Sequence, residues 1–246
     1  MATIYDVAAY AGVSPKTVSR VINGDAPVSD KTRAKVETAI AALGYIPSSA
    51  ARVMRSNRSG LIGLITGAIS RTGEYGGVHG LPDMFLIKGI QQKIREAGKT
   101  LMIADTDNRY EQIDPLVRTF MEHRAEGILY VTESHREIVL PEMPNRCPMV
   151  LVNCFDAAGT PSVLPDDERG QYDLVRNIIR HGHRRIAYIT LQAGAEATRL
   201  RLAGYRRALD ESDMVFDPDL VQTGITDFAN DSEPLIAAVL KLLSLA

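Results

Sequence analysis

Apolar residues recur with helical spacing in three short stretches near the start of the chain. In the first stretch they lie at i, i+3, i+4 and i+7, the spacing of an amphipathic α-helix of about two turns. The apolar positions are Ile4, Val7, Ala8 and Ala11, then Val18, Val21 and Ile22, and then Val36, Ile40 and Leu43. We expect these three helices to share one small core within the first 45 residues.

Polar residues and glycine mark where these helices begin and end. Thr3 followed by Asp6 is a variant of the capping box, and Gly12 ends the first helix. Ser14 can cap the second helix, whose first residue is Pro15. The connection over 12–14 is so short that the second helix must cross the first steeply, which is the geometry of a helix-turn-helix.

The second helix presents hydrogen-bonding side chains on its outward face. Such groups suit base edges and phosphates in the major groove of DNA. The alternative is an ordinary solvated helix face, but the abrupt helix ends and the basic charge of this region favour DNA binding. The outward residues are Lys16, Thr17, Ser19, Arg20 and Asn23.

From Leu61 onward, short apolar runs replace the helical spacing. The runs "LIGLIT", "TLMIAD", "GILYVT" and "MVLVN" are typical of buried strands, and helical stretches over 85–97 and 111–123 lie between the first three. This alternation predicts a parallel sheet with helices on both sides. A second set follows, with a helix over 169–180, the strand "RIAYITL", a helix over 196–211 and the weak start of another unit.

Charge divides the chain into two parts. The net charge of the 246 residues is −2, but residues 1–60 carry eight Lys or Arg against four Asp or Glu, and the remainder carries 20 against 26. A basic head therefore precedes an acidic body. The sequence predicts no signal peptide and no membrane span, and Cys147 and Cys154 do not form a disulfide framework, so we expect a cytoplasmic protein.

The head resembles one family of bacterial transcription regulators. "TIYDVAAYAGVSPKTVSRVING" and "VSDKTRAKVETAIAALGYIPSSAARVMRS" are similar to the start of the lactose-repressor and galactose-repressor (LacI/GalR) family, and "PDDERGQYDLVRNIIRHGHRRIAYI" and "TRLRLAGYRRAL" are similar to its effector-binding module. The resemblance implies an all-α helix-turn-helix head and an α/β two-lobed parallel-sheet domain like the periplasmic binding proteins. It implies a DNA-binding domain over 1–46, a hinge over 47–60, a first lobe over 61–158 and a partial second lobe over 159–246.

The resemblance also implies which residues touch DNA. In the family, two exposed residues after the turn and a later Arg read operator bases, and these match Pro15, Lys16 and Arg20. Pro15 can offer only apolar contact, so the other two residues carry more of the recognition. The full predicted set is Thr3, Ser14, Pro15, Lys16, Thr17, Ser19, Arg20, Asn23 and Met54.

Met54 belongs to the hinge, where a helix of about two turns could form after Ser48 or Ser49. So short a helix is marginal without packing partners, and we expect it to fold when DNA binds. In the family, an apolar side chain from this helix enters the minor groove, and Met54 is the matching residue. The alternative is a disordered linker.

Arg201 matches the position that commonly contacts the small effector, and its planar guanidinium suits a sugar hydroxyl or a carboxylate. The alternative is a surface Arg that makes an i,i+4 contact. Asp166 and Asp167 lie where the family usually has Asp-Asn near the crossover between the lobes, and we interpret them as helix-start and hinge residues rather than as chemical groups.

No catalytic, cofactor or metal site is predicted. The glycines of "TGEYGGVHG" match no phosphate-binding motif, and a mobile loop is the better interpretation. His181 and His183 have no Cys or carboxylate at a familiar metal-ligand spacing. Ser, His and Asp residues occur, but nothing in the sequence places them together.

The sequence thus predicts a DNA-binding transcriptional regulator, a repressor of a palindromic operator, that forms a homodimer in the intact family form and responds to a sugar or related metabolite. The alternatives are a small-molecule-binding protein with a vestigial head and, less favoured, an α/β enzyme. Family members usually continue beyond the length of this chain. We therefore expect a truncated or fragmentary chain with an incomplete second lobe, weak stability and a monomeric state. The effector, the operator and the choice between induction and corepression are not predicted.

Overall fold

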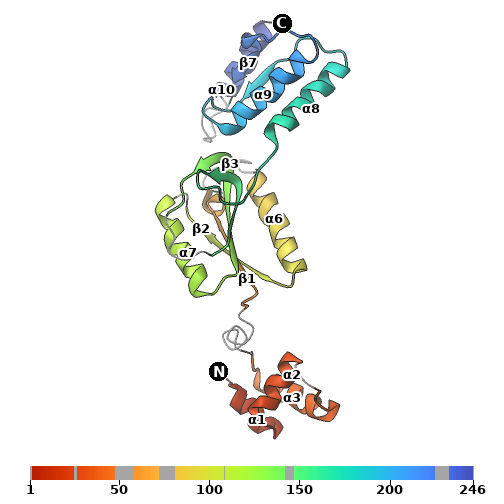
Figure 1. Ribbon diagram of the computed structural model, residues 1–246, viewed down its shortest axis with the longest axis vertical. Helices are drawn as coiled ribbons and strands as arrows, with labels where there is room; N and C mark the ends of the chain where they lie inside the picture. The colour runs from red at the N-terminus through yellow and green to blue at the C-terminus, as the bar shows by residue number, and fades with distance from the viewer. Residues whose placement is uncertain are drawn as a thin grey trace. The chain divides into compact units, whose positions relative to one another are not determined.

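The computed structural model describes residues 2–24, 27–47, 58–71, 81–107, 109–141, 147–224 and 233–245. The chain divides into two compact units, residues 1–59 and 60–246. The first is a small all-helical head and the second is an α/β unit (Figure 1). In the described part of the chain, no helix is both long and apolar enough to cross a bilayer.

The head consists of α1 (Ile4–Ala11), α2 (Pro15–Asn23) and α3 (Asp30–Leu43). Their inward faces form one core, as the spacing of the apolar residues predicted. Its buried members are Val7, Ala8, Ala11, Val18, Val21, Val36 and Ala39. Ile4, Val13, Ile22, Ile40, Leu43 and Tyr45 pack around them. The shared core fixes α2 against the other two helices, so the outer face of α2 is held in a defined orientation.

Local hydrogen bonds define the ends of these helices. The Asp6 amide donates to Thr3 Oγ1 at 3.3 Å and the Thr3 amide donates to Asp6 Oδ2 at 2.7 Å, so the predicted capping box is present. Ser14 Oγ accepts from the Thr17 amide at 3.2 Å at the start of α2. Gly12 has φ of 65°, a left-handed conformation that glycine adopts without strain, and it ends α1.

The second unit contains a five-stranded parallel sheet with the order β2-β1-β3-β4-β5. The five strands are β1 (Leu61–Thr66), β2 (Thr100–Asp105), β3 (Gly127–Ile138), β4 (Met149–Asp156) and β5 (Ser162–Val163). β3 continues six residues past the predicted run, which ended at Thr132, and its register with β4 shifts between Val131 and Arg136. This irregularity moves the end of β3 relative to its neighbour.

One helix covers each face of this sheet. α7 (Ile113–Glu122) packs Phe120 and Val117 against one face, and α6 (Leu81–Glu96) packs Ile87 against the other (Figure 1). A Cβ on Gly63 of β1 would lie 2.6 Å from the Phe120 ring, so this glycine permits the close approach of α7. The predicted helices began at 85 and 111; α6 starts earlier, and a 3-10 turn, η1 (Tyr110–Gln112), precedes α7. A single turn of helix, α5 (Ala68–Arg71), follows β1.

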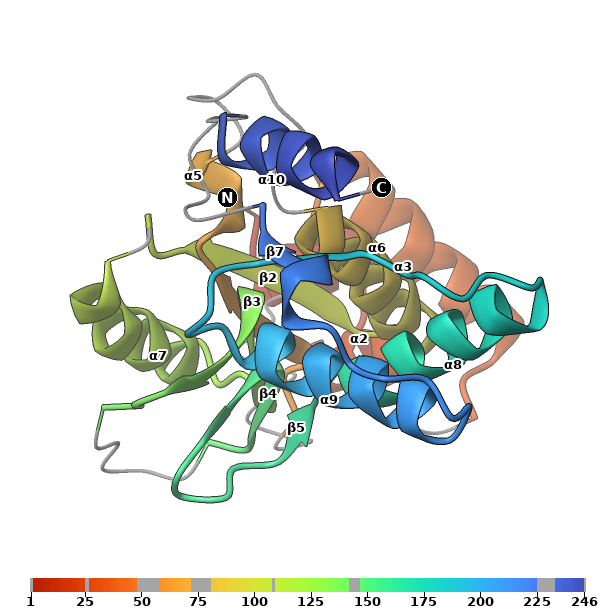
Figure 2. The same ribbon diagram turned by 90° about the horizontal axis from the view of Figure 1, so that it is seen from above.

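The last part of the unit is a smaller lobe. It contains α8 (Asp167–Arg180), β6 (Tyr188–Thr190), α9 (Glu196–Asp210), η2 (Pro218–Leu220), β7 (Val221–Thr223) and α10 (Glu233–Ser244). β6 and β7 form a two-stranded parallel sheet, and β6 is shorter than the predicted strand "RIAYITL". The views of Figures 1 and 2 both show α8 and α9 side by side.

α8 and α9 approach each other closely at Gly204. A Cβ at this position would lie 2.1 Å from the carbonyl oxygen of Glu168, so only glycine fits there. The close contact brings the start of α8 against the middle of α9. On α10, in contrast, the apolar side chains of Leu240 and Leu243 are exposed.

Candidate DNA-binding surface and candidate effector site

The outer face of α2 is the candidate DNA-binding surface. Lys16, Arg20 and Asn23 are exposed, whereas Thr17 and Ser19 are half-buried. Asn23 Nδ2 donates to the Ser19 carbonyl oxygen at 2.7 Å, and these two residues therefore support the end of the helix as well as its surface. α2 thus presents fewer fully exposed polar groups than the sequence suggested.

Several of the predicted DNA contacts have capping roles in the structure. The Thr3 hydroxyl donates to Asp6 Oδ2 at 2.7 Å, and the Ser14 hydroxyl lies 2.9 Å from Thr17 Oγ1. Pro15 is the first residue of α2 and is half-buried. Met54 and most of the predicted hinge lie outside the described residues, so Met54 as a minor-groove wedge stays a prediction.

Lys16 and Arg20 are cations without a carboxylate partner among the described residues. No ion pair within that part of the chain involves either side chain, and no carboxylate on α2 lies beside them. An exposed cation that no protein anion neutralises attracts phosphate and can donate to guanine in the major groove. The N-terminus of α2, which follows Ser14, adds a partial positive charge near Lys16.

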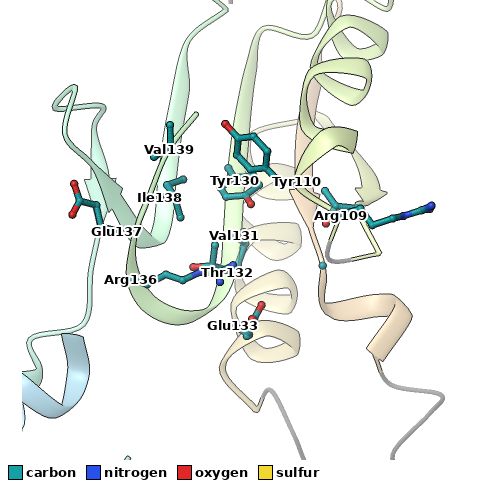
Figure 3. A pocket seen from close by; sticks show the side chains of 12 residues that line it. Arg109, Tyr110, Tyr130, Val131, Thr132, Glu133, Arg136, Glu137, Ile138 and Val139 are labelled. Atoms are coloured by element: carbon teal, nitrogen blue, oxygen red, sulfur yellow. The ribbon is translucent and has the colours of Figure 1, made fainter. Parts of the chain in front are cut away.

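A cavity of about 270 Å³ lies in the second unit at the carboxyl ends of β1, β2 and β3. Gly67 follows β1, Thr106 follows β2, and β3 contributes a continuous lining over 130–133. Open parallel sheets bind ligands at this edge. In Figure 3, Arg136 extends toward Thr132, while Arg109 extends away from it. This cavity is one candidate ligand site, and its lining does not include Arg201, the predicted effector residue.

Polar groups at this edge are held by hydrogen bonds. Asn153 Nδ2 donates to the Thr132 carbonyl oxygen and Thr132 Oγ1 donates to the Asn153 carbonyl oxygen, both at 3.0 Å. Burial raises the pKa of the Tyr130 phenol, and the nearby charge of Arg136 acts in the opposite direction. The cavity lining therefore includes Thr132, which is held by Asn153, together with the charged residues Arg136, Glu133 and Glu137, and this polar lining suits a hydroxyl-rich ligand better than an apolar one.

The predicted effector residue Arg201 lies in a network of three side chains. Arg201 Nε donates to Asp167 Oδ1 at 2.7 Å, and His135 Nδ1 lies 2.9 Å from Asp167 Oδ2. The Asp167 and His135 side chains are only 4% and 5% exposed, whereas Arg201 is 41% exposed. Arg201 is therefore not the i,i+4 surface residue of the alternative interpretation, because its partner lies 34 positions earlier in the chain.

Asp166 and Asp167 have different roles in the structure, whereas the sequence suggested helix-start and hinge roles for the pair. Asp166 Oδ1 accepts from the Arg169 amide at 3.1 Å and caps α8, as a helix-start residue does. Asp167 is the first residue of α8, but its buried carboxylate binds Arg201 and His135. Burial raises the pKa of the Tyr188 phenol, whose surroundings include both Arg201 and Asp167.

Sequence reasoning missed His135 and most of the cavity. A usable signal was present, because the runs "LIGLIT" and "GILYVT" close on Thr66 and Thr132, polar residues that prove to be buried. Polar residues at the carboxyl ends of parallel strands face the ligand edge of a sheet. His135 gave no such signal, since it follows the apolar run and lies where the register of β3 with β4 shifts.

A helix-turn-helix head with exposed cations, joined to an α/β unit with a polar cavity at its sheet edge, defines a ligand-responsive DNA-binding regulator. Comparison with known proteins agrees with this class. Residues 3–48 match the family "Bacterial regulatory proteins, lacI family", and residues 84–244 match "Periplasmic binding proteins and sugar binding domain of LacI family". The chain belongs to the lacI family of bacterial regulatory proteins.

Individual relatives support the same membership. The ribose operon repressor of Escherichia coli K12 is 34% identical over 233 residues, which cover 93% of this chain and 67% of that protein. The HTH-type transcriptional repressor PurR of Vibrio campbellii is 32% identical over 244 residues, which cover 96% of this chain and 69% of that protein. These relatives are repressors rather than enzymes.

Solved structures show the same fold. A LacI-family regulator from Rhizobium etli superposes with a TM-score of 0.65 at 32% identity, covering 76% of this chain and 65% of that one. The lac repressor dimer bound to operator and the anti-inducer ONPF gives a TM-score of 0.65 at 26% identity, covering 87% and 63%. The chain therefore spans slightly less than two thirds of the length of these two structures.

Proposed function

We propose that this chain represses transcription by binding a palindromic operator in the cytoplasm through α2, and that a small metabolite, a sugar or similar, at the sheet edge beside Arg201 controls that binding. The observation that carries the DNA-binding part is the pair of exposed cations, Lys16 and Arg20, on a helix whose position is fixed by caps and a shared core.

The geometry of the head supports reading of bases by α2. Arg20 lies on the exposed face four positions after Lys16, so the two side chains emerge from the same side of the helix. A bidentate contact from Arg to guanine is the commonest specific contact in the major groove. Lys16 is placed one turn nearer the N-terminus of α2, where recognition helices meet base edges.

A palindromic operator has two equivalent half-sites, which a dimer with two heads can bind at the same time. One helix-turn-helix contacts only a few base pairs, so specific affinity needs two heads about one helical turn of DNA apart. The lac repressor that this chain resembles is a dimer bound to operator in its solved structure. We propose the same assembly for this chain.

The DNA-binding proposal is tested by selecting a site from a random duplex library and measuring its affinity by fluorescence anisotropy at fixed salt. We expect the selected site to bind at least about a thousandfold more tightly than random DNA. Lys16→Ala and Arg20→Ala should each remove part of this preference. Arg169→Ala, at an exposed arginine paired with Asp173, is the matched control and should leave it unchanged. A library that yields no enriched site would favour a ligand-binding protein with a vestigial head.

The effector proposal is tested with D-ribose first, because the ribose operon repressor is among the relatives. D-ribose and a panel of other uncharged sugars are added to the complex with the selected duplex, and the change in anisotropy is recorded. We expect one sugar to change operator affinity in the wild type and to lose its effect in Arg201→Met. An effect that survives Arg201→Met would place the effector elsewhere.

A further inference from the structure

The buried carboxylate of Asp167 has both of its oxygens engaged by residues from different elements. Arg201 of α9 donates to Oδ1 at 2.7 Å, and His135 of β3 lies 2.9 Å from Oδ2. An ionised carboxylate only accepts hydrogen bonds, so His135 Nδ1 is the donor in this contact. Asp167 therefore joins the end of β3 and the start of α8 to the second turn of α9.

Only part of Arg201 is used in this network. Its Nε donates to Asp167, and within the described residues no partner is recorded for its two terminal amino groups. The side chain is 41% exposed, so these donors are open to a ligand. Their fork geometry fits two neighbouring oxygen atoms, whether those belong to hydroxyls, a carboxylate or a phosphate.

Charge distinguishes among these ligands. The Asp167 carboxylate cancels the charge of Arg201 at hydrogen-bonding distance, where screening by solvent is weak because Asp167 is buried. The next ion pairs on the same helices are already matched, Arg199 with Glu196 and Arg207 with Glu168, both at 2.5 Å. An anionic ligand at Arg201 would therefore gain no net attraction and would meet the fixed negative charge of Asp167.

We infer that Asp167 is a specificity-determining residue of the effector site: it leaves Arg201 as a neutralised donor that accepts uncharged, hydroxyl-rich ligands and rejects phosphorylated or carboxylated ones. His135 is a positioning residue, because it fixes the carboxylate that performs the neutralisation. The inference rests on the proposed place of Arg201 in the effector site. It adds the charge class of the ligand and the residue that selects it.

The test uses the full chain and inorganic phosphate as the probe, titrated by calorimetry at constant ionic strength and constant pH. Asp167→Asn keeps the shape of the side chain and removes its charge. We expect it to bind phosphate at least about tenfold more tightly than the wild type. The gain should disappear in the double variant Asp167→Asn, Arg201→Met.

A matched control is available on the same helix. Asp173 accepts from Arg169 Nε at 2.8 Å, the same kind of contact in an exposed setting. Asp173→Asn removes one negative charge from α8 without touching Arg201, so its phosphate affinity should equal that of the wild type. Equal affinities for Asp167→Asn and Asp173→Asn, or a gain that persists without Arg201, would overturn the inference.

His135 provides a second and independent test in case Asp167→Asn does not fold, which circular dichroism reports. His135→Leu removes the donor that fixes Asp167 and should raise phosphate affinity in the same direction, whereas His135→Asn, which retains a donor, should restore the wild-type value. Identical affinities in the two variants would show that His135 only fills space. Operator binding is measured in parallel. If neither the wild type nor any variant binds a selected operator, the proposed function is contradicted, whereas the comparison of phosphate affinities still tests the inference.

Discussion

Arg20 on α2 and Arg201 on α9 carry the same side chain in different electrical surroundings. Arg20 is exposed on a helix without a carboxylate, whereas Arg201 donates to a carboxylate that is 4% exposed. The first arrangement attracts a polyanion from a distance. The second provides directed donors with little net charge, which suits a small neutral molecule. The presence of arginine alone therefore does not reveal the charge of the partner.

The two units also differ in how they hold their functional residues. In the head, the bonds that shape α1 and α2 join residues three or four positions apart, such as Thr3 with Asp6 and Ser14 with Thr17. In the second unit, His135 and Asp167 are 32 positions apart. Damage to the packing of one unit should therefore leave the other largely intact.

Phe120→Ala gives the largest expected effect and tests this independence. Phe120 is 1% exposed and packs beneath β1, so its truncation should lower the free energy of unfolding of the second unit by about 3–5 kcal/mol. Hydrogen exchange measured during chemical denaturation of this variant should show that the backbone amides of α1–α3 remain protected. Phe85→Ala, at a 66% exposed position, is the control and should cost less than about 0.5 kcal/mol. Loss of protection in the head would contradict the independence of the units.

Arg20→Ala sharpens the comparison of the two arginines. We expect it to weaken binding to the selected operator by about 1–3 kcal/mol and binding to random DNA much less. The measurement is the ratio of the two affinities at one salt concentration. Equal losses on both DNAs would mean that Arg20 contacts phosphate only.

Ser14→Ala tests whether the cap positions α2 independently of any DNA contact. Removal of the hydroxyl that accepts from the Thr17 amide should cost about 1 kcal/mol of stability in the head, as seen in its thermal unfolding. Ser14→Asn should recover most of the loss because asparagine is also a good cap. A variant that keeps full stability but binds DNA poorly would assign Ser14 to the DNA instead.

Acid titration of the head gives the smallest effect. Backbone and side-chain hydrogen bonds from Thr3 lower the pKa of the Asp6 carboxyl below its ordinary value. A depressed folded-state pKa stabilises the head above the unfolded pKa of about 3.9, and that contribution disappears as the pH falls through the folded value. The Tm of the head should therefore fall less between about pH 6 and pH 2 in Asp6→Asn than in the wild type. Parallel curves would show that the capping box has no part in acid stability.

The sequence predicted the features that depend on contacts between nearby residues better than those that depend on residues far apart in the chain. The three helices of the head, their caps and their core are encoded within a few residues of each other, and the structure confirms them. The parallel sheet was also predicted, because apolar runs such as "LIGLIT" report buried strands directly. The length of β3 and the position of His135 depend on pairing with β4, a segment that follows later in the chain, and no local pattern encodes that pairing.

Asp166 and Asp167 are identical neighbours in the sequence but have different structural requirements. At position 166 the cap needs only a short side chain with an acceptor, so serine, threonine or asparagine can replace aspartate with little loss. At position 167 the side chain must be short, buried, ionised and in contact with two partners at once. Within one dipeptide of this chain, then, tolerance to mutation should change from broad at position 166 to almost none at position 167.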